Sequence, residues 1–442
     1  MSTNEEYDLS KLFTDSLSND NVLMLATTVD TGFEWEAADE CKEKFDKNAT
    51  IVRDRGKIFF NVPKDQFRKI QEMRSIDNIY IVANVQKFEF SETTKESDLK
   101  LFRDAVHSSM DLKKCLEAWK ELTGFQGKIF PSKEEYDTAD KQYKSVEKPV
   151  LDPNSRGKKR GTDPTKTCED EILRYRVTCE RTGKHVFESG EIARTIGGEL
   201  QDKYHWLVDL TTYHLEVYCK LVKDELVTQL RVTHESKHRR NIVAFGPTTL
   251  RATVCYNLLR LTHPKKGEII MDPMCGGGSI PIEAVLAYPY SFVLCGDNHP
   301  KAVLRAKSNI DASTGEAKID LSYWSAFNLP LPKYYVDIIV SDMPFGKRSG
   351  TKVDNRVLYK NCLIEFGRVL KLSTGRMVLL TYDRHSFNQA LSAAGNMFWV
   401  TKMLGVNIGG LQAAVYVIKR TDIDYEKYKP RTISNYNHNQ KH

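Results

Sequence analysis

The chain has 442 residues, 40% of them hydrophobic and 28% charged, with a formal net charge of +6. These values are ordinary for a globular protein of two or three domains, and the modest positive charge permits nucleic-acid binding without demonstrating it. Nine cysteines without a CxxC pair argue against a disulfide framework and against a tetrahedral zinc site, so we expect a reducing compartment and no metal. A polar, acidic start and no run of membrane-span length lead us to expect a cytoplasmic protein without a membrane partner.

The first predicted module is an α+β unit over residues 20–95. Its apolar patterns and turn signals follow the order β-α-β-β-α-β, which is typical of a ferredoxin-like fold. The expected elements are strands at Val22–Val29, Thr50–Arg53, Lys57–Val62 and Ile79–Val85, with a helix after Gly32 and a short helix at Gln66–Met73.

Residues 96–168 are predicted to be a helical segment followed by a linker. Apolar spacing over Asp98–Leu122 fits one or two helices, and the periodicity then fades up to Thr167 among several prolines. The basic run Arg156–Arg160 is either a solvated part of this linker or an arm that contacts RNA.

A second α+β module is expected over residues 169–240. It combines a strand at Tyr175–Cys179, a helix at Ser189–Asp202, further β character at Trp206–Leu210 and a hairpin of His214–Lys220 with Leu226–Val232. The basic cluster Ser236–Asn241 then precedes a helix at Thr248–Leu261, with Thr248 as its N-cap. Arg239 and Arg240 are either phosphate-binding residues or members of a structural ion-pair cluster.

The C-terminal domain, residues 245–422, begins with a strand, a glycine turn and a helix over Glu268–Ala284. Pro281 stands where a dinucleotide fingerprint has its third glycine, so NAD or FAD binding is disfavoured, and no GK[ST] sequence indicates a P-loop. Asp297 closes the next strand, 25 residues after Asp272, where a carboxylate can bind both hydroxyls of a ribose.

The fourth strand of this domain, Tyr335–Val340, leads to the sequence Asp342-Met343-Pro344-Phe345-Gly346. A carboxylate, backbone carbonyls freed by proline and a flat ring can hold a planar exocyclic amine and stack on its base. The alternative is an ordinary turn, because Asp, Pro and Gly are common turn residues.

The remaining elements complete an α/β sheet that ends in a β-hairpin. They are helices at Lys301–Ile310, Leu358–Leu370 and Ser386–Ala394, and strands at Ile319–Tyr323, Gly375–Thr381, Trp399–Val406 and Ala413–Lys419. The final hairpin departs from a plain alternating βα plan.

Several long strings give a specific resemblance. HRRNIVAFGPTTLR, MDPMCGGGSIPIEA, DMPFGKR, TGRMVLLT and VNIGGLQAAVYVIKRT resemble the THUMP domain-containing protein 3 group of eukaryotic tRNA guanine-N2 methyltransferases. The similarity extends from about Thr27 to Arg420. It implies a Rossmann-like class I methyltransferase domain with a seven-stranded sheet and a C-terminal hairpin, preceded by ferredoxin-like and THUMP RNA-binding modules.

The resemblance also implies a reaction and partners. The expected activity transfers methyl from S-adenosyl-L-methionine to the N2 amine of a guanosine in the tRNA acceptor stem, at the sixth nucleotide. Members of this group act as a heterodimer with a small zinc-ribbon activator subunit.

Roles for individual residues follow from the motif positions. Asp342, Pro344 and Phe345 are the expected catalytic residues: the first two hold the amine, and the ring stacks on a flipped base. The expected cofactor-binding residues are Asp272, Pro273, Gly276, Gly278, Asp297, Asn298 and Asn328. The expected RNA-binding residues are Arg239, Arg240, Lys347 and Arg348.

Two departures from the family pattern keep an alternative open. The glycine turn reads Gly276-Gly277-Gly278 instead of GTG or GSG, and Ser325 stands where related sequences carry an acid that contacts the adenine amine. The alternative is a THUMP-containing RNA-binding protein with weak or lost catalysis. A DNA adenine methyltransferase shares the D-x-P-F motif but does not explain the first 240 residues.

Overall fold

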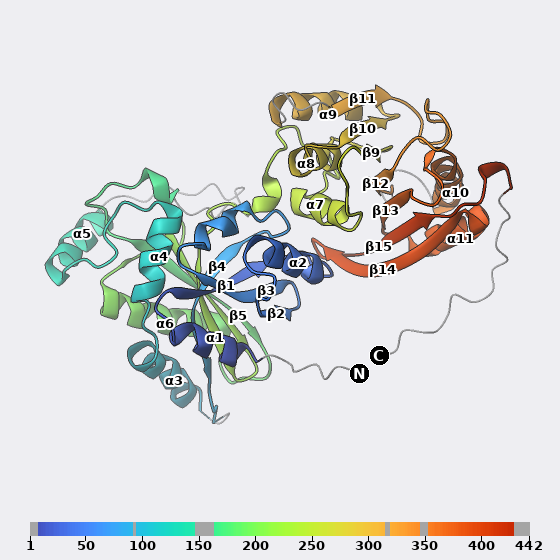
Figure 1. The fold of residues 1–442 in the computed structure, drawn as a ribbon. Helices are drawn as coiled ribbons and strands as arrows, with labels where there is room; N and C mark the ends of the chain where they lie inside the picture. The colour runs from blue at the N-terminus through green and yellow to red at the C-terminus, as the bar shows by residue number, and fades with distance from the viewer. Residues whose placement is uncertain (1–7, 92–93, 146–162, 314–318, 345–351, 428–442) are drawn as a thin grey trace. The chain divides into compact units, whose positions relative to one another are not determined.

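The computed structural model describes residues 8–91, 94–145, 163–313, 319–344 and 352–427 (Figure 1). The chain divides into two compact units. Unit 1 comprises residues 1–28, 41–73 and 78–236, and unit 2 comprises residues 29–40, 74–77 and 237–442. No helix in the described parts of the chain is long and apolar enough to cross a membrane.

Unit 1 contains the predicted ferredoxin-like arrangement. Its strands β1 (Val22–Thr28), β2 (Ile51–Asp54), β3 (Lys57–Pro63) and β4 (Ile79–Lys87) pair antiparallel in the order β2-β3-β1-β4. The helix after β1 is α2 (Glu34–Lys44), of which Glu34–Glu40 belong to unit 2, and the predicted short helix is a 3-10 helix, Phe67–Glu72. β1 and β3 are continuous apolar runs, as expected for strands that are buried on both faces over most of their length.

The strands of the second predicted module continue the same sheet. β4 pairs antiparallel with β8 (Glu225–Arg231), so all eight strands of unit 1 lie in the order β2-β3-β1-β4-β8-β7-β5-β6. The hairpin of β7 (Leu215–Val222) with β8 is confirmed, and β5 (Arg174–Thr182) runs parallel to β7 and to β6 (Leu207–Val208).

Unit 1 also contains five helices, of which the first lies before the predicted module at residues 20–95 and the fourth lies in the predicted linker. They are α1 (Leu9–Leu17), α3 (Lys95–Ser108), α4 (Lys113–Thr123), α5 (Lys133–Ser145) and α6 (Ser189–Tyr204). α5 occupies part of the predicted linker. It has no buried residue and carries two i,i+4 ion pairs, Lys133–Asp137 and Asp140–Lys144, so it has no apolar periodicity to detect. The basic run at residues 156–160 lies outside the described residues.

Unit 2 contains a seven-stranded sheet in the order β11-β10-β9-β12-β13-β15-β14. The first five strands in this order are parallel, and β15 is antiparallel to both β13 and β14, which confirms the predicted terminal hairpin. The bounds are β9 (Ile269–Asp272), β10 (Phe292–Asp297), β11 (Ile319–Tyr323), β12 (Ile338–Asp342), β13 (Arg376–Thr381), β14 (Phe398–Ile408) and β15 (Leu411–Arg420).

The helices of unit 2 form two groups with the strands between them (Figure 1). α7 (Ala252–Arg260), α8 (Ser279–Ala287) and α9 (Pro300–Ser313) make up one group, and α10 (Lys352–Val369) and α11 (Arg384–Ala394) make up the other. The prediction that Thr248 caps α7 is wrong, because Arg251 is the N-cap. A local turn delays the helix: the backbone N–H of Gly246 donates to Thr249 Oγ1 at 2.7 Å.

Candidate active site

The end of β12 is held rigidly by its neighbours. Asp342 lies in register with Leu380 of β13, and the next N–H, that of Met343, donates to the Leu380 carbonyl at 2.8 Å. The hydroxyl of Tyr359 donates to the Pro344 carbonyl at 2.6 Å. The backbone that follows Asp342 is therefore fixed from both sides.

The Asp342 carboxylate has an unused acceptor. Its Oδ1 is buried and has no hydrogen-bond partner among the described residues. Burial, together with the charge of Asp272, raises the pKa of Asp342 to about 8. A buried acceptor without a partner is costly to a fold, so it indicates a functional position.

Asp272, at the end of β9, is the second buried carboxylate. It accepts hydrogen bonds from the Ser341 hydroxyl at 2.8 Å and from the Met274 N–H at 3.2 Å. Burial raises its pKa to about 7, although both hydrogen bonds favour the ionised form. Ser341 thus ties the end of β12 to the end of β9.

The glycine turn is bonded to the end of β10. The Gly276 N–H donates to Asp297 Oδ2 at 3.0 Å, and the His299 N–H donates to Asp297 Oδ1 at 2.9 Å. Gly276 has φ of 55°, and a Cβ there would meet nothing within 4 Å, so the turn leaves open space beside it. Each carboxylate oxygen of Asp297 keeps a lone pair for a ligand.

These groups surround one cavity of about 440 Å³. Seven predicted site residues line it: Asp272, Pro273, Gly276, Asp297, Asn298, Asp342 and Pro344. Two predicted residues do not line it. Gly278 instead caps α8 with φ of 85°, and Asn328 is exposed. Phe345 lies outside the described residues.

The cavity also has a wall that sequence reasoning missed. Thr248, Thr249 and Leu250 line it just before α7 begins, together with His299, Ser325 and Phe327. The sequence predicts a helix from Thr248, with Thr248 as its N-cap, so it does not predict a loop along the cavity at Thr248–Leu250. Among the other residues of the wall, Ser325 is the position noted above as a departure from the family pattern. The sequence Phe245-Gly246-Pro247 could have indicated this loop. Gly and Pro interrupt helices, so the residues that follow them can form a loop as readily as the start of a helix.

The predicted RNA-binding residues have different surroundings. Arg240 donates to both carboxylate oxygens of Glu283, whose side chain is 1% exposed, and to the Arg74 carbonyl. This geometry favours the ion-pair alternative for Arg240. Arg239 is exposed, and Lys347 and Arg348 lie outside the described residues.

Comparison with known proteins gives a consistent set of matches. Residues 239–414 match the family model described as RMKL-like, methyltransferase domain. The chain is 39% identical to a Bos taurus tRNA (guanine(6)-N(2))-methyltransferase THUMP3, over 90% of this chain and 88% of the relative. It is 31% identical to a Mus musculus U6 snRNA (guanine-N(2))-methyltransferase THUMPD2, over 49% of this chain and 40% of that relative.

Two solved structures align with most of the chain. TrmN from Thermus thermophilus aligns with a TM-score of 0.68 and 22% identity, over 90% of this chain and 99% of that one. SMU.472, in a structure complexed with SAH, aligns with a TM-score of 0.64 and 13% identity, over 91% and 100% of the two chains. At these identities the structural matches support the fold.

Proposed function

This chain belongs to the family of tRNA (guanine(6)-N(2))-methyltransferases named THUMP3, and on that basis we propose that its cavity performs that reaction on a tRNA acceptor stem. The expected target is the exocyclic N2 amine of the sixth nucleotide. The observation that carries the proposal is the buried, unpartnered Oδ1 of Asp342 at the wall of the cavity. A lost catalytic function would not preserve such a costly acceptor.

The cavity residues fit S-adenosyl-L-methionine, which supplies an electrophilic methyl group on a positively charged sulfur. Asp297 offers lone pairs to the ribose hydroxyls, and the open face of Gly276 allows a close approach of ligand to backbone. Asp272 and Pro273 shape the end of the cavity next to β12. Three carboxylates around one cavity suit a cationic ligand.

Asp342 and Pro344 would orient the guanine amine. The amine has two N–H groups, and the Asp342 Oδ1 can accept one of them. The Pro344 carbonyl has two lone pairs, of which Tyr359 uses one, so the other can accept the second N–H. Holding the nucleophile in this way contributes several kcal/mol, on the order of 2–4, to lowering the barrier.

The rest of the RNA contact is proposed from the motif and module positions. Phe345 would stack on the flipped base, and Arg239, Lys347 and Arg348 would contact phosphates. Residues 20–95 and 169–240 would form the ferredoxin-like and THUMP modules that bind the tRNA, with 96–168 between them and the catalytic domain at 245–422.

We also propose the activator subunit and the compartment. The activator is a small zinc-ribbon protein that forms a heterodimer with this chain. All nine cysteines are free thiols, which fits a reducing compartment, and the tRNA substrate makes the cytoplasm the expected one.

The test is the identity and position of the product. The chain and its activator are incubated with methyl-labelled S-adenosylmethionine and a tRNA transcript, and the RNA is digested to nucleosides. Label in N2-methylguanosine is expected, and it should be lost when guanosine 6 of the transcript is replaced by adenosine. Label in any other nucleoside, or transfer to U6 snRNA but not to tRNA, would refute the proposal.

A further inference from the structure

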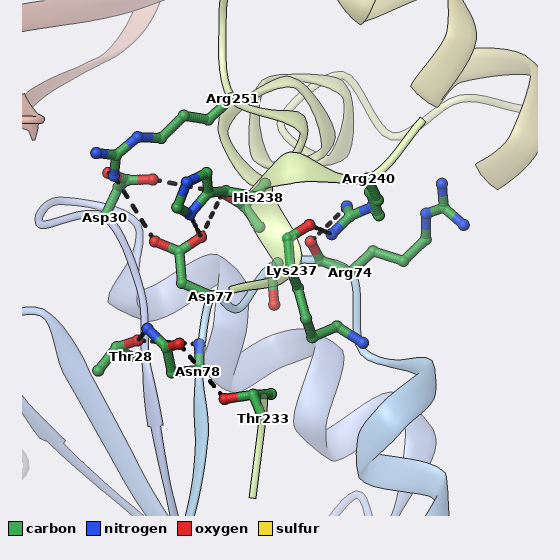
Figure 2. Close-up of polar contacts among 12 residues, drawn as sticks. Thr28, Asp30, Arg74, Asp77, Asn78, Thr233, Lys237, His238, Arg240 and Arg251 are labelled. Atoms are coloured by element: carbon green, nitrogen blue, oxygen red, sulfur yellow. Dashed lines mark hydrogen bonds and ion pairs between the residues drawn. The ribbon is translucent and has the colours of Figure 1, made fainter. Parts of the chain in front are cut away.

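Two short stretches from the first 80 residues belong to unit 2, far from the rest of that unit in sequence. They are Val29–Glu40 and Arg74–Asp77. They bring two carboxylates, Asp30 and Asp77, to the start of α7 (Figure 2). The methyltransferase family model begins only at residue 239, so the region that it matches does not include these two acids.

Arg251 is the basic residue that these carboxylates hold. Its Nη1 lies 3.0 Å from Asp30 Oδ1 and 3.7 Å from Asp77 Oδ2. The Asp30 side chain is only 3% exposed. The Thr253 hydroxyl donates to Asp77 Oδ1 at 2.8 Å, which fixes the second carboxylate on α7 itself. His238 Nδ1 is a second basic group beside Asp77, 3.8 Å from its Oδ1 (Figure 2). Removing the arginine would still leave the buried charge of Asp30 and Asp77 less compensated.

Arg251 directly follows the missed wall of the cavity. Thr248, Thr249 and Leu250 line the cavity, and Arg251 is the N-cap residue of α7. Its carbonyl accepts the Cys255 N–H at 3.0 Å and so begins the first helical turn. The backbone of Arg251 thus begins the helix, while its side chain is paired with Asp30 and Asp77. The two carboxylates therefore help to fix the position at which the wall ends and α7 begins.

A second anchor holds the segment of chain that leads into this wall. Asn309 of α9 is fully buried; its Oδ1 accepts the N–H groups of Val243 and Ala244, at 3.0 and 2.7 Å. Its Nδ2 donates to the carbonyls of Ala244 and Gly277, at 3.0 and 2.8 Å. One end of the wall is therefore tied to the glycine turn, and the other end depends on Arg251.

We propose that Arg251, held by Asp30 and Asp77, is a positioning residue for the cofactor pocket. The inference rests on the proposed function, because it takes the cavity to be the S-adenosylmethionine site. The N-terminal part of the chain then completes this pocket without touching the ligand. Releasing Arg251 would let the wall move and would weaken cofactor binding, while the reacting groups at Asp342 would stay in place.

The experiment compares full-length variants. Arg251→Met removes the charge, Arg251→Lys keeps it, and Asp30→Asn combined with Asp77→Asn removes its partners. The matched control is Arg376→Met, which breaks the Arg376–Glu268 ion pair (2.6 Å) of the same unit at residues that do not line the cavity. For each variant, the affinity for S-adenosylhomocysteine is measured by calorimetry. The melting temperature, KM for S-adenosylmethionine and kcat are measured as well.

Loss of the wall anchor has a distinctive signature. Arg251→Met and the double Asp variant should weaken S-adenosylhomocysteine binding about tenfold or more, since small displacements of a binding group have effects of this size. They should raise KM for S-adenosylmethionine and leave kcat at saturation within about twofold, and Arg251→Lys should recover part of the affinity. Arg376→Met should lower the melting temperature and leave the affinity unchanged.

Two results would overturn the inference. One is an affinity of Arg251→Met equal to that of the wild type, and the other is an equal loss of affinity in the Arg376→Met control. If Arg251→Met fails to fold, the affinity of the double Asp variant is compared with those of the wild type and of Arg376→Met in the same way. Failure of the wild-type protein to bind S-adenosylhomocysteine would instead refute the proposed function.

Discussion

At the scale of single residues, the site is a set of carboxylates kept away from water. Asp272 and Asp342 have pKa values raised to about 7 and 8, chiefly by burial. Their raised pKa values mark a place where the fold accepts an energetic cost for chemistry. Of the two, Asp342 has the acceptor without a partner, so it is the residue whose charge can be tested most cleanly.

The raised pKa of Asp342 makes its effect on stability depend on pH. The folded protein binds a proton that the unfolded chain releases near its ordinary value of 3.8, so stability falls as pH rises from about 4 to about 8. Asp342→Asn does not titrate. In the cofactor-free protein it should therefore melt at a similar temperature to the wild type near pH 4, and about 3 °C or more above it near pH 8.5. A melting-temperature difference that does not change with pH would contradict this prediction.

The same carboxylate should shape the pH dependence of the reaction. The guanine amine donates to the ionised carboxylate of Asp342, so only that form should be active. Because kcat/KM reports the pKa values of the free enzyme, kcat/KM should rise with pH and level off above about pH 8. The positive charge of bound cofactor lowers the pKa of Asp342. The rise of kcat with pH should therefore occur at lower pH than the rise of kcat/KM. Steady-state measurements of kcat/KM and kcat between about pH 6 and 9 test both rises. Rates that fall across this range would contradict the assignment.

At the scale of elements, the spacing between β10 and β11 positions Asp297, the carboxylate that we propose binds the ribose. Gly296 precedes Asp297 on β10, and a Cβ at that position would lie 2.5 Å from the Ser322 carbonyl and 2.5 Å from the Trp324 ring. Trp324 in turn donates its indole N–H to the Pro273 carbonyl at 3.1 Å. Glycine at 296 is therefore required by close packing of the strand beside the cavity.

Gly296→Ala should therefore disturb both folding and cofactor binding. The added methyl group would force β11 and Trp324 outward, at a cost of about 1–3 kcal/mol, and S-adenosylhomocysteine binding should weaken with it. Gly405→Ala is the matched control, because a Cβ on that β14 residue would meet nothing within 4 Å. Urea unfolding and calorimetry measure the two effects. Equal behaviour of the two variants would show that the spacing of β10 and β11 is not critical.

Most elements could be predicted because their signals are local. Three strands of unit 2, β9, β10 and β12, end in aspartate, and the seven strands follow one another along the chain as the sequence predicts. α5 and the start of α7 could not be predicted in the same way. The first lacks an apolar face, and the second is delayed by a turn that depends on a side-chain hydrogen bond of Thr249.

At the scale of the whole molecule, the two compact units are not two consecutive halves of the sequence, because unit 2 includes residues 29–40 and 74–77. Seven predicted residues meet in the cavity, because motifs at strand ends fall at one edge of a parallel sheet. The role of Asp30 and Asp77 could not be predicted from the same reasoning. Their contact with Arg251 joins residues more than 170 positions apart, and no local pattern around either acid points to that arginine.

Activity should depend on the second subunit. The chain expressed with the zinc-ribbon activator should give a stable one-to-one complex that transfers methyl to tRNA, and the chain alone should be much less active. Size-exclusion chromatography and a transfer assay test this directly. Full activity of the isolated chain would rule out the activator as a required partner.

The most direct test of the account is single-turnover methyl transfer by wild type and Asp342→Ala, each with its activator and saturating S-adenosylmethionine. The variant should bind tRNA with the wild-type affinity and form N2-methylguanosine at least about 100-fold more slowly, because the amine loses its buried acceptor. Formation of N2-methylguanosine at the wild-type rate would contradict the assignment of the active site to Asp342.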